Sequence, residues 1–273
     1  MKLMVCIVAF VVACGAPSQK TPHTEAPAPT ATHAARATGS VSPEEDAVNP
    51  SRARERNVYV DEVVVSNPLT IRGRARTFEN NVALRARSAD GSVVARGFTT
   101  SRGEMGRHNP FEGVLWLTSD PGRVVTVEAL EYSAKDGSEQ SLVRVEKRFD
   151  LEAIQPALYF PDETCTAVRP FPRRMPKSVS MARLLAEALV GGPDARERAA
   201  GASAPFPDGS AVQSVLLRDG VLTVDFNERL RNVGGSCRAE MIRKSVTATM
   251  TALPSVKRVI ITAAGSEALA LQP

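Results

Sequence analysis

Seven short runs of alternating apolar and polar residues follow one another between residues 57 and 150. They read VYVDEVVV, LTIRGRA, VALRARS, SVVARGFTT, FEGVLWLT, RVVTVEALEYS and SLVRVEKRF. A period of two places every second side chain on one face of a strand, so each run predicts a half-buried β-strand. Turn pairs such as Asp90-Gly91 and Asp136-Gly137 separate the runs and favour tight hairpins. Seven strands in this length predict an immunoglobulin-like β-sandwich.

The large aromatic side chains of this segment are interpreted as core residues. They are Phe78, Phe111 and Trp116. The alternative is a carbohydrate-stacking role. The segment contains no cysteine, so the predicted sandwich lacks the disulfide of antibody domains.

Residues 156–273 show a different pattern, in which helical and strand periods alternate. The run ALYFPDET predicts a strand, and SMARLLAEALVGGP predicts a helix that Gly191-Gly192-Pro193 ends. AVQSVLLRDGVLTVDF predicts a hairpin around Asp219-Gly220. CRAEMIRKSVTATMTALP predicts a second amphipathic helix, and SVKRVIITAAG the last strand. The order β-α-β-β-α-β predicts an α/β domain with two helices on one ferredoxin-like sheet.

The first 13 residues form a third kind of segment. A short basic start precedes ten apolar residues, a run too short for a membrane span of about 20 residues. It fits the apolar region of a secretory signal peptide. The residues VVAC resemble a bacterial lipobox, although Val11 stands where leucine is usual. The resemblance implies cleavage before Cys14 and attachment of lipid to it.

Residues 14–56 are rich in Pro, Ala, Thr and Ser and predict a disordered tether, because they bury too little surface to offset chain entropy. A flexible chain of this length spans roughly 35 Å. His23 and His33 lie in the tether, which argues against a ligand role for them. We expect an exported protein, lipid-anchored on the outer leaflet of the cytoplasmic membrane or the periplasmic side of an outer membrane.

Two family resemblances cover the predicted domains. GRARTFENNVALRARSADGSVV, NPFEGVLWL and VEALEYSAKDGSE resemble the immunoglobulin-like domain of bacterial spore germination proteins. VSMARLLAEALVGGP, VLLRDGVLTVDF and GGSCRAEMIRKSVTATMTALPSVKRVIIT resemble the GerMN domain of sporulation and germination lipoproteins. The resemblance implies a role in the cell envelope. It supplies no catalytic residue.

Two cysteines remain once Cys6 leaves with the signal peptide and Cys14 is acylated. An even pair in an exported chain favours a disulfide between Cys165 and Cys237, and a GerMN subgroup has cysteines at the matching places. In a ferredoxin-like sheet these positions lie at opposite edges, so the bond requires a long reach of residues 227–236 or a different topology. The alternative is a redox-active pair, although neither CxxC nor an adjacent histidine is present.

Catalytic and metal motifs are absent from the sequence. It contains no G-x-S-x-G, S-x-x-K, H-E-x-x-H or Walker sequence. His108, the one histidine within a predicted domain, is interpreted as a loop residue. The carboxylate pairs Glu128 with Glu131 and Asp225 with Glu228 are interpreted as solvated faces of strands. No enzyme activity, metal or cofactor is therefore expected.

The net charge of +4 comes from arginine, since only seven of the 34 basic residues are lysine. It predicts a solvated surface, or an affinity for anionic lipid or wall polymer, and no nucleic-acid partner. We expect a non-catalytic envelope protein that contacts envelope proteins or peptidoglycan and has no small-molecule substrate. The alternatives are an accessory lipoprotein of a membrane sensor kinase and an enzyme acting on peptidoglycan or glycan. Oligomer formation is left open.

Overall fold

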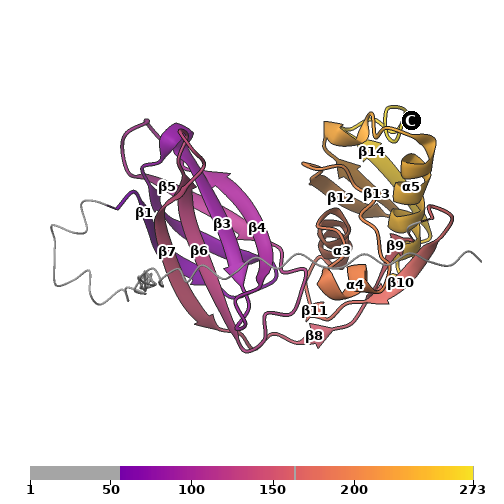
Figure 1. Cartoon of the computed structure of the whole chain (residues 1–273), viewed down its shortest axis with the longest axis horizontal. Helices are drawn as coiled ribbons and strands as arrows, with labels where there is room; N and C mark the ends of the chain where they lie inside the picture. The colour runs from indigo at the N-terminus through magenta and orange to yellow at the C-terminus, as the bar shows by residue number, and fades with distance from the viewer. Residues whose placement is uncertain (1–55, 163, 273) are drawn as a thin grey trace, which may run out of the picture. The chain divides into compact units, whose positions relative to one another are not determined.

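The computed structural model describes residues 56–162 and 164–272 (Figure 1). The predicted signal peptide, Cys14 and the predicted tether as far as residue 55 lie outside the described residues. No described helix is both long enough and apolar enough to cross a membrane.

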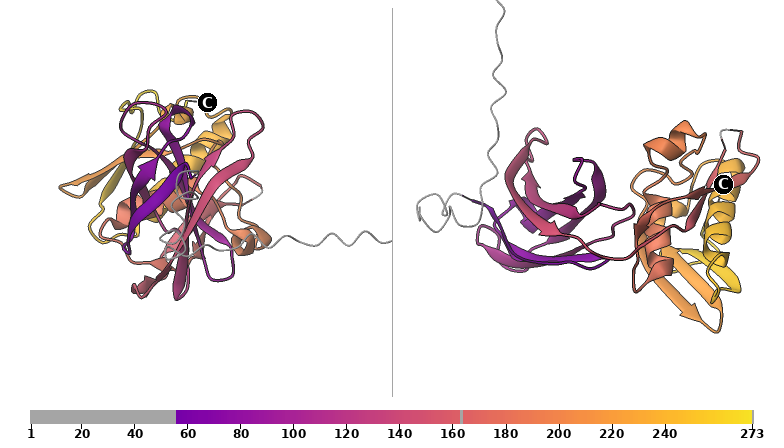
Figure 2. Two further views of the ribbon diagram at one scale, coloured as in Figure 1. Left: turned by 90° about the vertical axis from the view of Figure 1, so that its left-hand side faces the viewer. Right: turned by 90° about the horizontal axis from the view of Figure 1, so that it is seen from below.

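The first domain is a β-sandwich of seven antiparallel strands, one for each alternating run of the sequence. One sheet has the order β1-β2-β5 and the other the order β4-β3-β6-β7, and the two sheets face each other (Figures 1 and 2). The strands are β1 (Val58–Val64), β2 (Leu69–Ala75), β3 (Asn81–Arg87), β4 (Val93–Thr100), β5 (Asn109–Leu115), β6 (Val124–Tyr132) and β7 (Glu139–Arg148).

Alternation in the sequence becomes alternation in burial. In β5 the side chains of Phe111 and Leu115 are buried, whereas those of Glu112 and Val114 are exposed. The buried faces of both sheets meet in one hydrophobic cluster that includes Leu69, Ile71 and Leu84. Each fully buried aliphatic side chain stabilises the fold by roughly 1.5–3 kcal/mol. The sandwich is therefore held by packing between its sheets, without a disulfide.

The second domain contains a three-stranded sheet with the order β12-β13-β14, in which β13 and β14 are parallel. Helix α5 packs against β14 and against the separate hairpin β9-β10, while α3 packs against β12, β9 and α5. The elements of this domain are β9 (Ala157–Pro161), β10 (Val168–Pro172), α3 (Met181–Val190), α4 (Ala195–Ala199), β12 (Val212–Arg218), β13 (Val221–Phe226), η2 (Glu228–Leu230), α5 (Ser236–Thr251) and β14 (Arg258–Ala263). Ahead of it, β8 (Ala153–Ile154) pairs with β11 (Met175–Pro176).

The predicted helices and the predicted hairpin are present. The hairpin turns at Asp219 and Gly220, whose φ angles are 52° and 83°. Two consecutive positive φ angles are typical of the type I′ turn that Asp-Gly favours.

The ferredoxin-like pairing is wrong. In that topology the first strand lies between the third and the last, but here β14 pairs directly with β13 and β9 pairs with β10. The sequence VRPFP forms β10, which the strand pattern does not reveal because Pro170 and Pro172 lack backbone N–H groups and suit only an edge strand. The Thr249 hydroxyl of α5 accepts a hydrogen bond from the Tyr159 backbone N–H (3.0 Å), which fixes the hairpin to the helix.

A buried ion pair connects Arg173, which follows β10, to Glu197 of α4. The Nε atom of Arg173 donates to Glu197 Oε1 (2.8 Å), and its Nη2 atom donates to the Gly192 carbonyl (2.9 Å). Both side chains are only 5% exposed. Glu197 also completes a capping box with Asp194 at the start of α4. The helix α3 ends before Gly191-Gly192-Pro193, and the Gly192 carbonyl there accepts a hydrogen bond from the buried Arg173.

Candidate binding pocket

The face of β3 and β4 that points away from the sandwich core carries a pocket of about 720 Å³, which we call the aromatic pocket. Three large aromatic side chains line it and are exposed to solvent: Phe78 (61%), Phe98 (77%) and Tyr132 (47%). In the strand register Phe98 lies opposite Ala83, and Arg96 lies opposite Arg85. The small side chain of Ala83 therefore forms the floor between larger neighbours.

A strained turn presents Phe78 at the rim of the pocket. The short helix η1 (Phe78–Asn80) contains Glu79 with φ 53° and Asn80 with φ 58°. Consecutive non-glycine residues in the left-handed region are uncommon, and such conformations persist only where the surroundings hold them. Here the Asn80 carbonyl accepts from the Ser101 N–H (2.8 Å), and the Asn80 amide donates to the Gly103 carbonyl (3.1 Å).

Glu131 is the second support of this turn. Its Oε1 atom accepts the Phe78 backbone N–H (2.8 Å), and its Oε2 atom accepts the Asn57 amide (3.1 Å). The Glu131 side chain is buried, with 8% exposed. A buried carboxylate therefore orients the backbone that exposes a phenyl ring.

These positions reverse two sequence-based interpretations. Phe78 was expected in the core and is mostly exposed, whereas Glu131 was expected on a solvated face and is buried. Phe78 is exposed because β2 ends at Ala75, so residues 76–80 no longer follow the strand period. Phe111 is buried as expected, and Trp116 is partly buried.

Glu128 is also buried, although the alternating pattern predicted a solvated side chain. It is fully covered and accepts hydrogen bonds from Arg85 (2.7 Å), Arg87 (3.0 Å) and Arg144 (2.9 Å). Arg85 also forms an ion pair with Glu139. Strands β3 and β7, which flank β6, thus contribute three arginines to one carboxylate. The sequence signal for this cluster is the Arg-x-Arg of β3 opposite a glutamate of β6.

Electrostatics keep this cluster charged. Burial alone would raise the pKa of Glu128, but hydrogen bonds from Arg144 and Arg87 and the charge of Arg85 outweigh it and lower that pKa. The hydrogen bond from Arg85 lowers the pKa of Glu139 as well. A general acid or base works best with a pKa near the working pH, so these carboxylates are suited to holding structure.

The other candidate groups lie elsewhere. His108 is exposed in the loop before β5, where its Nε2 atom lies 2.9 Å from the Arg56 carbonyl oxygen. Asp225 accepts from the Thr262 hydroxyl (2.5 Å) and the Gly265 N–H (2.9 Å), and Glu228 begins η2. Within the two described ranges, no group of three or more His, Cys, Asp or Glu side chains has an arrangement that would hold a metal ion.

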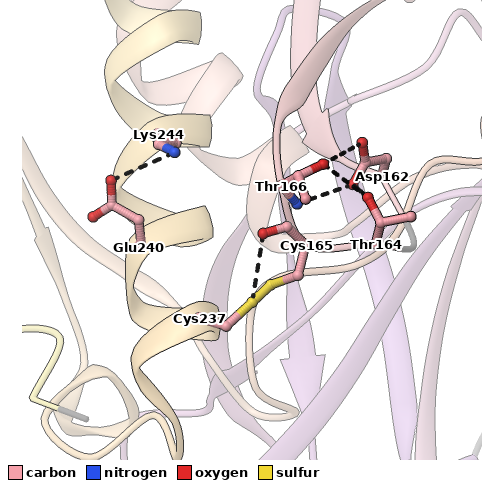
Figure 3. Close-up of a disulfide and its surroundings, with 7 residues drawn as sticks. All are labelled: Asp162, Thr164, Cys165, Thr166, Cys237, Glu240 and Lys244. Carbon is pink, nitrogen blue, oxygen red and sulfur yellow. Dashed lines mark hydrogen bonds and ion pairs between the residues drawn. A yellow bond between two sulfur atoms is a disulfide. The ribbon is translucent and has the colours of Figure 1, made fainter.

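A disulfide joins Cys165 to Cys237, whose Cα atoms are 6.4 Å apart (Figure 3). Cys165 lies in the turn between β9 and β10, and Cys237 in the first turn of α5. Because the hairpin packs on α5 and not within the main sheet, its turn reaches the helix directly. The Thr164 hydroxyl donates to Asp162 (2.8 Å) and thereby lowers the pKa of that carboxyl.

Comparison with known proteins agrees with both family resemblances. Residues 157–269 match the family described as sporulation and spore germination, and residues 60–138 match the immunoglobulin-like domain of bacterial spore germination. No curated protein sequence matches the chain.

Solved structures of other proteins are similar to part of the chain, among them the following three. The first GerMN domain of the sporulation protein GerM from Bacillus subtilis is 28% identical, with 41% of this chain and 84% of that chain covered and a TM-score of 0.37. The tandem GerMN domains of the same protein are 24% identical, with coverages of 42% and 40% and a TM-score of 0.34. A putative lipoprotein from Clostridium perfringens is 19% identical, with coverages of 42% and 76% and a TM-score of 0.28. By the two family matches, this chain carries a domain of the sporulation and spore germination family preceded by an immunoglobulin-like domain of the bacterial spore germination type.

Proposed function

We propose that the protein is a non-catalytic, lipid-anchored component of the cell envelope that binds an envelope partner through the aromatic pocket. The observation that carries the proposal is the cluster of Phe78, Phe98 and Tyr132, three exposed rings around one pocket. Exposed apolar groups gathered in one place mark binding sites more often than isolated ones do.

The charged groups around the pocket support binding in preference to catalysis. Arg85 is held by Glu128 and Glu139, and Glu131 is held by backbone and amide N–H groups. Side chains fixed in this way shape a surface and are not arranged as a nucleophile with its base. Neither domain family is known for catalytic activity.

The anchor is supported by the sequence before the described residues. An apolar run, the lipobox-like VVAC and a Pro- and Ala-rich segment stand in the order that a lipoprotein requires. In an exported protein of this kind Cys14 carries the lipid, and residues 14–56 give the two domains their reach from the membrane.

Metabolic labelling with palmitate tests the anchor. We expect label in the wild-type protein and in Cys6→Ala, and none in Cys14→Ala, because only Cys14 follows the cleavage motif. Cys6→Ala is the matched control, since it changes a cysteine of the same apolar segment. Label that persists in Cys14→Ala would show that the anchor is elsewhere.

Crosslinking in cells tests the binding role of the pocket. A photoreactive amino acid in place of Phe98 in the full-length protein should attach to an envelope component. The same group in place of Met105, which is 73% exposed and does not line the pocket, should attach much less. Equal attachment at the two positions would overturn the proposal.

A further inference from the structure

We propose that the aromatic pocket binds an uncharged saccharide segment of an envelope glycan, with Phe78, Phe98 and Tyr132 as stacking surfaces. This inference rests on the proposed function and names the chemistry of its partner.

The rings give the pocket flat apolar surfaces beside polar groups. Phe98 projects from β4, Tyr132 from the end of β6 and Phe78 from η1, so they come from three separate elements. Asn81 and Ser133 also line the pocket. A pyranose ring has an apolar face of C–H groups and a rim of hydroxyl groups, which matches aromatic faces beside hydrogen-bonding side chains. The pocket volume also falls within the usual range for small ligands, roughly 300–1,000 Å³.

Strand β4 is the edge strand of its sheet, but strand β5 of the other sheet lies against that edge, which disfavours a peptide added as a strand. The strands β4, β3 and β6 bond to one another along the pocket floor. At the outer edge of β4, strand β5 of the other sheet approaches closely: the Thr99 hydroxyl donates to the Glu112 carbonyl (2.6 Å). A Cβ atom on Gly97 would lie 3.1 Å from the Leu115 side chain. Peptide recognition by strand addition needs a free edge, so side chains must recognise the ligand.

The charges of the pocket balance. Arg96 and Glu79 are its exposed charged side chains, and neither forms an ion pair with another described residue. Arg85 and Glu131, the other two charged residues of the lining, are held by their neighbours. Two basic and two acidic groups leave no net charge to attract a polyanion. An uncharged ligand with many hydroxyl groups can bind both the acidic and the basic side chain, since a hydroxyl donates to Glu79 and accepts from Arg96.

The pocket is organised before a ligand arrives. Glu131 accepts the Phe78 backbone N–H, and Asn80 bonds to Ser101 and Gly103, so hydrogen bonds on both sides hold η1 with its two positive φ angles. Binding to a preformed surface loses little conformational entropy, and this raises affinity for a weakly interacting polar ligand. A role in binding also accounts for the strained backbone of Glu79 and Asn80 at the rim of the pocket, since such strain is common at binding sites.

Direct binding of saccharides by the full-length protein in detergent tests the inference. The probes are the β-1,4-linked tetramer of N-acetylglucosamine, measured by titration calorimetry, and purified peptidoglycan, measured by co-sedimentation. We expect the wild type to bind both probes. Phe98→Ala should weaken binding roughly tenfold, because it removes the apolar surface of a phenyl ring that the ligand would cover.

Two comparison variants make the test specific. Phe78→Ala, which removes a second stacking surface from the turn, should weaken binding in the same way. Met105→Ala, which removes an equally exposed apolar side chain outside the pocket, should bind within twofold of the wild type. Failure of the wild type to bind either saccharide, or equal binding by Phe98→Ala, would overturn the inference.

The outcomes separate the two proposals. Crosslinking from position 98 to an envelope protein, without saccharide binding, would overturn the saccharide inference and leave the binding function in place. Equal crosslinking from positions 98 and 105 would overturn the binding function itself.

Discussion

The β-sandwich and the α/β domain each bury an Arg–Glu group, but they place it differently. In the sandwich, Glu128 and its arginines lie across strands that the sheet already holds in register. In the α/β domain, Arg173 and Glu197 connect segments that no sheet joins. The α/β domain also has a hairpin outside its main sheet, fixed by the bond between Cys165 and Cys237. In the α/β domain an ion pair and a disulfide thus connect segments that strand pairing does not connect.

The largest effect is expected when the buried ion pair of the α/β domain is broken. Glu197→Ala leaves the Arg173 guanidinium buried without its main counter-charge, which costs about 3–5 kcal/mol of unfolding free energy. Urea unfolding followed by far-ultraviolet circular dichroism measures it, since the described α-helices all belong to this domain.

A matched exposed pair serves as the control for that variant. Lys177 and Glu152 form an ion pair with side chains that are 59% and 66% exposed. Glu152→Ala should cost less than about 1 kcal/mol. Equal losses in the two variants would contradict the role assigned to the buried pair.

The disulfide should rank second. The double variant Cys165→Ser with Cys237→Ser is expected to lose about 2–4 kcal/mol, because the bond closes a loop of 72 residues. Hydrogen exchange with mass spectrometry should show faster exchange in β9, β10 and the start of α5, and unchanged exchange in the sandwich. Non-reducing peptide mapping of the wild type should recover the linked peptides; two free thiols in the exported protein would refute the bond.

Acid should act on the sandwich through Glu128 and Glu139. Both carboxyls have a pKa lowered in the folded state, so their contribution is present above the unfolded value and is lost as pH falls through the folded value. Exchange protection of β3, β6 and β7 should therefore weaken below about pH 5. Glu128→Gln should flatten this pH dependence, and an unchanged profile would show that the cluster does not contribute.

The smallest effect is expected on the surface of the sandwich. Arg74 pairs with Asp61 at 3.1 Å, with side chains that are 55% and 47% exposed. Arg74→Ala should cost only about 0.2–1 kcal/mol, and salt should reduce the difference from the wild type. A loss as large as that of Glu197→Ala would remove the contrast between exposed and buried pairs.

Local patterns were sufficient for the sandwich strands and for α3 and α5, and insufficient for β10 and for the pocket. The period of two predicted all seven sandwich strands, and Asp219-Gly220 predicted the hairpin of β12 and β13. The pocket was missed because Phe78 and Glu131 exchange their expected environments. No local pattern reports that a glutamate of β6 accepts the backbone N–H of a residue 53 positions earlier.

The sequence by itself determined the seven sandwich strands, the helices α3 and α5 and the turn between β12 and β13, since these depend on neighbours within a few residues. Only the tertiary structure decided that β9 pairs with β10, that β14 pairs with β13, and that three aromatic rings meet around one pocket. Burial and strand pairing depend on which distant segments cover a residue. Alternation of apolar and polar residues specifies the two faces of a strand. Which segment packs against each face depends on the packing of the whole domain.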